Sequence, residues 1–288
     1  MNNRNHSLVL SITASIIIAG QTGCAGTLAE DEEDVGTAES ALEIDNALTP
    51  NALTPNALTP NALTPNAPTP NALTPNALTP NALTPIKDPG TAGTLSRDFL
   101  KYTVGCALST SQSFSFSWTD SDSVVHNETY VGLLGLATAW TTGPLDLAGQ
   151  RIVSACLASR TNYYGTTVLF SARSPLEPLN SGLSNGELNS YKEVEGAFWG
   201  NIFSSIPYLN TCYDAANVAN SRSKMRDCAV GHLVNGVPVE CGIINITGAC
   251  STVCSGLDGQ DKYPSCTDHA EIPGSTATTN HVVSSVLK

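Results

Sequence analysis

Charge is scarce in this sequence and unevenly divided between the two signs. Charged residues make up 13% of the 288 residues, whereas soluble domains average about 25%. Acidic residues outnumber basic ones 25 to 13, which gives a formal net charge of −12. Nucleic-acid binding depends on clustered lysine and arginine side chains that neutralise phosphates. The shortage of basic residues therefore predicts no nucleic-acid partner.

The short motifs that identify common catalytic and cofactor sites are also missing. The sequence contains no Gly-x-Gly-x-x-Gly, no phosphate-binding loop, no His-Glu-x-x-His and no Gly-x-Ser-x-Gly. We therefore expect no nucleotide cofactor and no catalytic zinc of the usual type. What the sequence does contain concerns where the protein is located and how it is built.

Residues 1–24 have the pattern of an export signal. A positive charge precedes a twelve-residue apolar run, which is too short to cross a bilayer core of about 30 Å. The run leads to Gly-Cys24, which resembles the end of a bacterial lipobox, although Gln21 stands where an aliphatic residue is usual. Lipidation of Cys24 leaves an even number of cysteines for disulfides. It predicts a lipid anchor in a membrane, and cleavage after Ala25 to give a secreted form is the alternative.

Residues 25–45 and 46–85 have the composition of linkers. Eight acidic and no basic residues lie between Glu30 and Asp45, which is typical of a disordered, solvated segment. Residues 46–85 are eight consecutive Asn-Ala-Leu-Thr-Pro pentapeptides, in which Pro68 is the one departure. Proline in every repeat blocks helix and central strand, so we predict an extended, semi-rigid spacer. Its Thr-Pro steps are alternatively sites of O-glycosylation.

This organisation resembles that of exported proteins of unknown function from myxobacterial-type gliding bacteria. The resemblance rests on the lipobox-like start, the pentapeptide array, the Cys-rich C-terminal part and the segments Asp98–Tyr102, Val153–Leu157 and Glu195–Asn201. It implies export and surface location. It implies no activity and no site residues.

Residues 86–288 form the predicted globular part, an α+β domain reinforced by disulfides. Strict alternation of Phe and Ser predicts a half-buried strand, and apolar residues at helical spacing predict amphipathic helices. Ser96 is the expected N-cap of a helix that begins at Arg97. The expected helices are 97–108 and 147–159, the expected strands are 114–118, 124–131 and 165–173, and residues 175–189 and most of the chain after Phe203 are expected to be loop.

Eight cysteines in this domain predict a disulfide framework, since exported proteins meet an oxidising compartment. Two of them, Cys106 and Cys156, stand apart on predicted helices, and we expect them to bond each other. The remaining six should then pair among themselves: Cys212, Cys228, Cys241, Cys250, Cys254 and Cys266. Zinc is the competing interpretation, beginning at Cys250-x3-Cys254 with Cys241, Cys266 or His269 as further ligands. The compartment favours disulfides, so we predict no metal.

Candidate site residues concentrate in one stretch, 191–201. It combines aromatic rings, which stack on sugars or pack in a core, with two carboxylates two residues apart. Two carboxylates also serve in glycoside hydrolysis, although this spacing is common by chance. Its two glycines suggest a specially shaped loop. The predicted contact residues are Tyr191, Glu193, Glu195, Phe198, Trp199 and Asn201. The segment Asp268-His-Ala-Glu271 offers a second group of two carboxylates and an imidazole.

The sequence leaves two functions open. The leading hypothesis is a non-enzymatic binding or structural module that is displayed on a tether and contacts a cell-surface glycan or protein. The alternative is a secreted hydrolase acting on glycan or peptide, for which no catalytic signature is visible.

Overall fold

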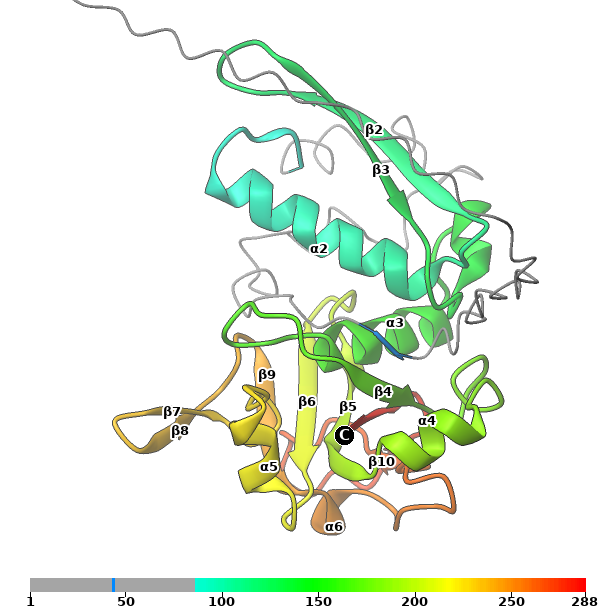
Figure 1. Ribbon diagram of the computed structural model, residues 1–288, viewed down its shortest axis with the longest axis vertical. Helices are drawn as coiled ribbons and strands as arrows, with labels where there is room; N and C mark the ends of the chain where they lie inside the picture. The colour runs from blue at the N-terminus through cyan, green and yellow to red at the C-terminus, as the bar shows by residue number, and fades with distance from the viewer. Residues whose placement is uncertain (1–42, 45–85) are drawn as a thin grey trace, which may run out of the picture. The chain divides into compact units, whose positions relative to one another are not determined.

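A computed structural model describes residues 43–44 and 86–288 (Figure 1). The predicted export signal, the lipidation site Cys24, most of the acidic segment and the pentapeptide spacer lie outside the described residues. The described domain is a mixed α+β fold, as predicted. Strand β1 (Glu43–Ile44) pairs with an edge of its main sheet, so these two residues of the acidic segment differ from the expected disordered state.

The central element is a six-stranded sheet with the order β1-β4-β12-β5-β6-β9. It is antiparallel except for one parallel pair, β6 and β9. The C-terminal strand β12 lies between two earlier strands and is buried along its whole length. Besides β1, the strands of this sheet are β4 (Phe170–Arg173), β5 (Glu193–Asn201), β6 (Tyr208–Tyr213), β9 (Ile244–Ala249) and β12 (Val283–Leu287).

Helices α3 (Leu147–Ser159) and α2 (Thr91–Ala107) form two further layers over one face of the sheet (Figure 1). Helix α3 packs on β5 and β12, and α2 packs on α3. A hairpin of β2 (Ser113–Thr119) and β3 (Val125–Val131) lies over α2 (Figure 1). The inward Phe114 and Phe116 alternate with outward serines, which is the predicted pattern. One large apolar core runs between these layers.

Helix α3 has the predicted bounds, and its start is fixed by a cap. The Asp146 side chain accepts a hydrogen bond from the Gly149 amide at 2.7 Å. Helix α2 begins six residues earlier than predicted, so Ser96 is an interior residue and not the cap. Its first turns are held by Arg97, whose guanidinium donates to the carbonyl oxygens of Ile86 and Asp88, each at 2.9 Å. These contacts reach back to residues before the helix, so the usual helix start signals do not reveal them.

The second half of the domain is more ordered than predicted. Residues 193–201 form a strand and not a loop, β4 is shorter than expected, and the stretch 175–189 ends in a short helix capped by Ser184. The smaller elements are η3 (Thr138–Thr141), α4 (Asn185–Ser190), α5 (Val218–Ser223), β7 (His232–Val234), β8 (Val237–Val239), α6 (Cys250–Val253), β10 (Cys266–Thr267) and β11 (Thr278–Thr279).

Four disulfides join the eight cysteines of the domain, and the predicted pairing is confirmed. Cys106–Cys156 ties α2 to α3, and the other six cysteines pair among themselves as Cys212–Cys250, Cys228–Cys241 and Cys254–Cys266. Such a framework indicates an extracytoplasmic domain. Within the described residues, no helix is long and apolar enough to span a membrane.

Candidate functional site

The predicted contact stretch lies in the interior of the domain, so the expected surface site is corrected to a core strand. Phe198 and Trp199 have 0% of their surface exposed and point to opposite faces of β5. Phe198 joins the core beneath α3, whereas Trp199 joins a second core cluster on the other face of the sheet. The Trp199 indole donates to the Thr267 carbonyl at 2.9 Å. Core packing, the alternative use of these aromatics, is what the structure supports.

The polar members of that stretch are also committed to the fold. Glu195 is fully buried and forms an ion pair with Arg226, and it accepts a hydrogen bond from the Ser285 hydroxyl at 2.7 Å. Asn201 donates to the Gln150 side chain at 3.0 Å. Tyr191 is buried, and Glu193 is partly exposed. None of the Glu195 surface is exposed, so a substrate cannot reach its carboxylate, and Glu193 and Glu195 do not form a glycosidase pair.

A pocket of about 460 Å³ lies at the N-terminal end of α3, in a region where sequence reasoning placed no site. This volume falls within the usual range for small-molecule sites. The buried Trp140 of η3 contributes an aromatic side chain to its lining. The lining comes from η3, the first turns of α3 and two distant loops: Gly135, Leu136, Ala137, Thr138, Ala139, Trp140, Pro144, Leu145, Asp146, Ala148, Gly149, Ile152, Leu176, Glu177 and His281.

The pocket combines apolar walls with negative charge. Asp146 and Glu177 are its charged lining residues, and no lysine or arginine lines it. Hydrogen bonds from Ser181 to the Glu177 carboxylate hold the pKa of that group below its usual range, despite an opposing contribution from desolvation. Glu177 is therefore ionised at neutral pH. The pocket should disfavour anions and admit neutral or cationic groups.

His281 supplies the remaining titratable group of the lining. Burial lowers its pKa, and the positive charge of Arg151 lowers it further, against the opposing effect of Asp146 and Asp268. The imidazole is therefore neutral at physiological pH. Its Nδ1 lies 3.4 Å from the Thr279 hydroxyl. A neutral imidazole at the wall of an apolar pocket offers a ligand one directional hydrogen bond.

Beyond His281, a polar network fixes the neighbouring loop. Asp268 forms an ion pair with Arg151 at 2.9 Å and accepts a hydrogen bond from the Tyr208 hydroxyl at 2.8 Å. The His269 ring stacks on Tyr208 and pairs through Nδ1 with Glu271 at 2.8 Å. The two carboxylates of the predicted Asp268-His-Ala-Glu271 group thus face different partners. They hold the loop and do not converge with the imidazole on one reacting atom.

A second site-like arrangement surrounds His232. Its Nδ1 pairs at 2.8 Å with Asp227, a buried carboxylate that also accepts from the Tyr164 hydroxyl at 3.1 Å. Tyr163 stacks on the imidazole with ring centroids 3.5 Å apart. A hydrolytic triad also needs a hydroxyl or thiol bonded to Nε2. The hydrogen bonds found for His232 within residues 86–288 involve Nδ1 alone.

Two groups of possible metal ligands contain cysteines that are already bonded. Cys212, Cys254 and Cys266 lie close together, as do Asp227, Cys228 and Cys241. Zinc binds the thiolate, and a disulfide sulfur is not one. The oxidised domain therefore uses these cysteines as cross-links.

No protein-family model, curated protein or solved structure matches this chain. One sequence signal points to the pocket in retrospect: the Leu-Leu-Gly-Leu-Ala-Thr-Ala-Trp run at 133–140 is apolar yet fits neither helix nor strand. It forms much of the pocket wall.

Proposed function

We propose that residues 86–288 are a binding module displayed outside the cytoplasm, which takes an apolar, neutral or cationic group of its ligand into the pocket at the start of α3. The observation that carries this proposal is a ligand-sized cavity with apolar walls, two carboxylates and one neutral imidazole. Apolar lining supplies affinity, while a few polar groups orient the ligand.

The lining favours a protein side chain or small apolar molecule over a glycan. Sugars need many hydrogen-bond partners, whereas only Thr138, Asp146, Glu177 and His281 contribute polar side chains, apart from the indole of Trp140. The absence of lysine and arginine from the lining argues against carboxylate and phosphate ligands. A protein partner on a cell surface therefore fits better than a cell-surface glycan.

The proposed setting is a lipid anchor at Cys24, followed by the spacer of residues 46–85. The anchor would make the membrane a partner, in the outer membrane or at the cell surface, with a secreted form as the alternative. At about 3.1 Å per residue, a fully extended spacer of this length reaches roughly 120 Å. Such a reach suits the capture of a ligand away from the membrane.

Matched probes test the pocket proposal. Naphthylmethylamine and naphthylacetate have the same ring and opposite charge, so ligand-detected NMR with the oxidised protein compares cation with anion directly. We expect the amine to bind more tightly, by roughly fivefold for an interaction of about 1 kcal/mol at a partly exposed site.

The variant Ala148→Trp places an indole at the pocket from an exposed helix position and should abolish the amine signal. The control is Lys101→Trp, at an exposed position of α2 outside the lining, which should bind as the native protein does. Equal binding by both variants, or tighter binding of the acetate, would overturn the proposal.

A further inference from the structure

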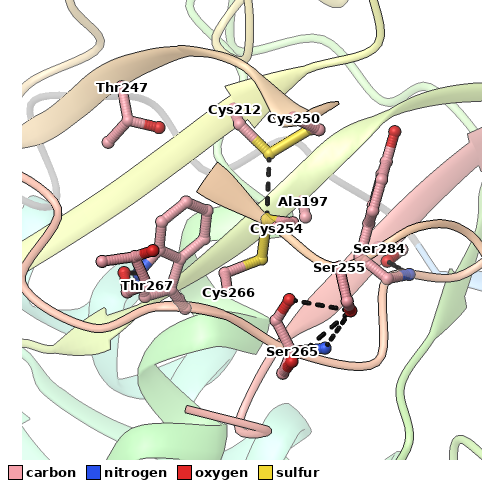
Figure 2. Close-up of a disulfide and its surroundings, with 12 residues drawn as sticks. Ala197, Cys212, Thr247, Cys250, Cys254, Ser255, Ser265, Cys266, Thr267 and Ser284 are labelled. Carbon is pink, nitrogen blue, oxygen red and sulfur yellow. Dashed lines mark hydrogen bonds between the residues drawn. A yellow bond between two sulfur atoms is a disulfide. The ribbon is translucent and has the colours of Figure 1, made fainter. Parts of the chain in front are cut away.

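Two of the four disulfides are in contact with each other. Cys212–Cys250 joins β6 to α6, and Cys254–Cys266 joins the residue after α6 to β10. The Sγ atoms of Cys212 and Cys254 lie 3.5 Å apart, and Figure 2 shows them facing each other across the gap. The sulfur atoms of Cys212, Cys254 and Cys266 all lie within 4.8 Å of one another. We call the four cysteines of these two disulfides the sulfur cluster: Cys212, Cys250, Cys254 and Cys266.

The backbone holds the sulfur cluster together independently of its covalent bonds. Strands β6 and β9 pair Tyr213 with Ala249, which places Cys212 beside the start of α6. The Cys254 amide donates to the Cys250 carbonyl at 2.8 Å. Cys254 and Cys266 face each other in a β-bridge. Breaking one S–S bond therefore leaves its sulfurs close to the remaining bond.

The hydrogen bonds next to that bridge add to this support. The Ser255 amide donates to the Ser265 carbonyl at 2.9 Å, and the Ser265 amide donates to the Ser255 hydroxyl at 3.1 Å (Figure 2). On its other side, Cys266 pairs with Thr279 of β11. The loop that Cys254–Cys266 closes is thus anchored at both ends without the disulfide.

Access to the sulfur cluster is one-sided. Cys212, Cys250 and Cys266 are buried, whereas Cys254 is partly exposed and is followed by the exposed Ser255. A thiolate from solution meets the Cys254–Cys266 bond first. Thiol–disulfide exchange depends on this access and on a further sulfur within reach of the thiolate that is released.

We propose that the sulfur cluster is a thiol–disulfide exchange site whose substrate is a small thiol. A first thiolate attacks Sγ of Cys254, the Cys254–Cys266 bond breaks, and the electron pair goes to Cys266. A second thiolate attacks the substrate sulfur of this mixed disulfide and releases Cys254 as a thiolate. Cys254 then attacks Sγ of Cys212 across the 3.5 Å gap, and Cys250 leaves as a thiolate.

The steps balance in atoms and electrons. Two substrate thiols are oxidised to one disulfide, and the protein is reduced by one disulfide overall. Their two protons end on the sulfurs of Cys250 and Cys266, while Cys212 and Cys254 become bonded. The domain thus moves a reducing equivalent from the accessible edge of the cluster to a buried cysteine.

Partial reduction of the full oxidised chain tests this transfer. The protein is treated with one equivalent of dithiothreitol, quenched in acid, alkylated and mapped by non-reducing peptide mass spectrometry. We expect the singly reduced species to carry alkyl groups on Cys250 and Cys266 and to contain a Cys212–Cys254 cross-link. Alkylation of Cys254 and Cys266 with Cys212–Cys250 intact would refute the transfer, as would reduction that begins at Cys106–Cys156 or Cys228–Cys241.

A variant makes the same test without reductant. Cys266→Ser leaves Cys254 as a free thiol beside Cys212–Cys250, and we expect the alkyl group to appear on Cys250 as well as on Cys254. In the control Cys241→Ser, the free thiol is Cys228, for which the described residues show no contact with a second disulfide. Its label should stay on Cys228. A label confined to Cys254 in the first variant contradicts the proposal.

Discussion

Replacement of Trp199 separates a core role from a surface role. In Trp199→Ala a fully buried indole is lost from the cluster that contains Tyr263, Val282 and Val286. Large-to-small changes of this kind cost about 3–5 kcal/mol, from lost burial and from the cavity that remains. Loss of the indole N–H also leaves the Thr267 carbonyl without its hydrogen-bond donor, which adds about 1 kcal/mol to the cost. We therefore expect a loss near the upper end of that range.

Trp199→Phe is the matched control for this prediction. It keeps an aromatic ring in the cluster and removes the N–H, so its cost should be about 1–3 kcal/mol from the unpaired carbonyl and the smaller volume. Urea unfolding of the oxidised protein, followed by circular dichroism, measures both variants. A loss below about 1 kcal/mol in the Ala variant, together with lost ligand binding, would show that Trp199 contacts ligand and that the core assignment is wrong.

Glu195→Gln should cost about 3–5 kcal/mol in urea unfolding, because it leaves the buried Arg226 charge without its carboxylate; the partly exposed Glu193→Gln should cost less than about 0.5 kcal/mol. Burial lowers the folded-state pKa of His281, so the unfolded chain takes up this proton first as pH falls below the ordinary value of 6.5. The stability of the folded domain should therefore decrease as pH falls below that value. Thermal melts at pH 7 and pH 5 should show a smaller decrease in melting temperature for His281→Gln than for the native protein. Mass spectrometry of the mature N-terminus should find a lipid on Cys24, and a free N-terminus at Gly26 in a detergent-independent protein would contradict this.

The elements that sequence reasoning predicted well each carry a recognisable signal in their own residues. The β2–β3 hairpin exposes serines and threonines opposite phenylalanines, so alternation alone identifies β2. Helix α3 carries apolar residues at helical spacing and is capped by Asp146. The Cys106–Cys156 pairing followed because the other six cysteines cluster in the final third of the chain. In these cases the local pattern contains the information that the fold uses.

Strand β5 was missed because both of its faces are buried, so alternation disappears. Its glycines looked like loop residues, but they are required by the neighbouring strand. A Cβ on Gly196 would lie 2.0 Å from the Cys212 carbonyl oxygen, and one on Gly200 would lie 2.4 Å from that of Tyr208. The same residues that suggested a specially shaped loop are thus evidence of close strand packing. This close packing can be recognised only once the position of the neighbouring strand β6 is known.

The pocket could not be predicted because its lining comes from four separate parts of the chain. Residues 135–152 provide most of it, and Leu176, Glu177 and His281 are brought in by the sheet topology.

The charge balance of the domain surface depends on where its basic residues lie. Residues 86–288 contain twelve basic and seventeen acidic residues. Five of the basic residues and four of the acidic ones are buried, which leaves seven basic against thirteen acidic residues with exposed surface; the buried basic residues are Arg97, Arg160, Arg173, Arg226 and Lys262. A domain that places so many of its few cations inside presents a mainly acidic surface. Such a surface supports the proposal of a neutral or cationic ligand, because it disfavours the approach of anions.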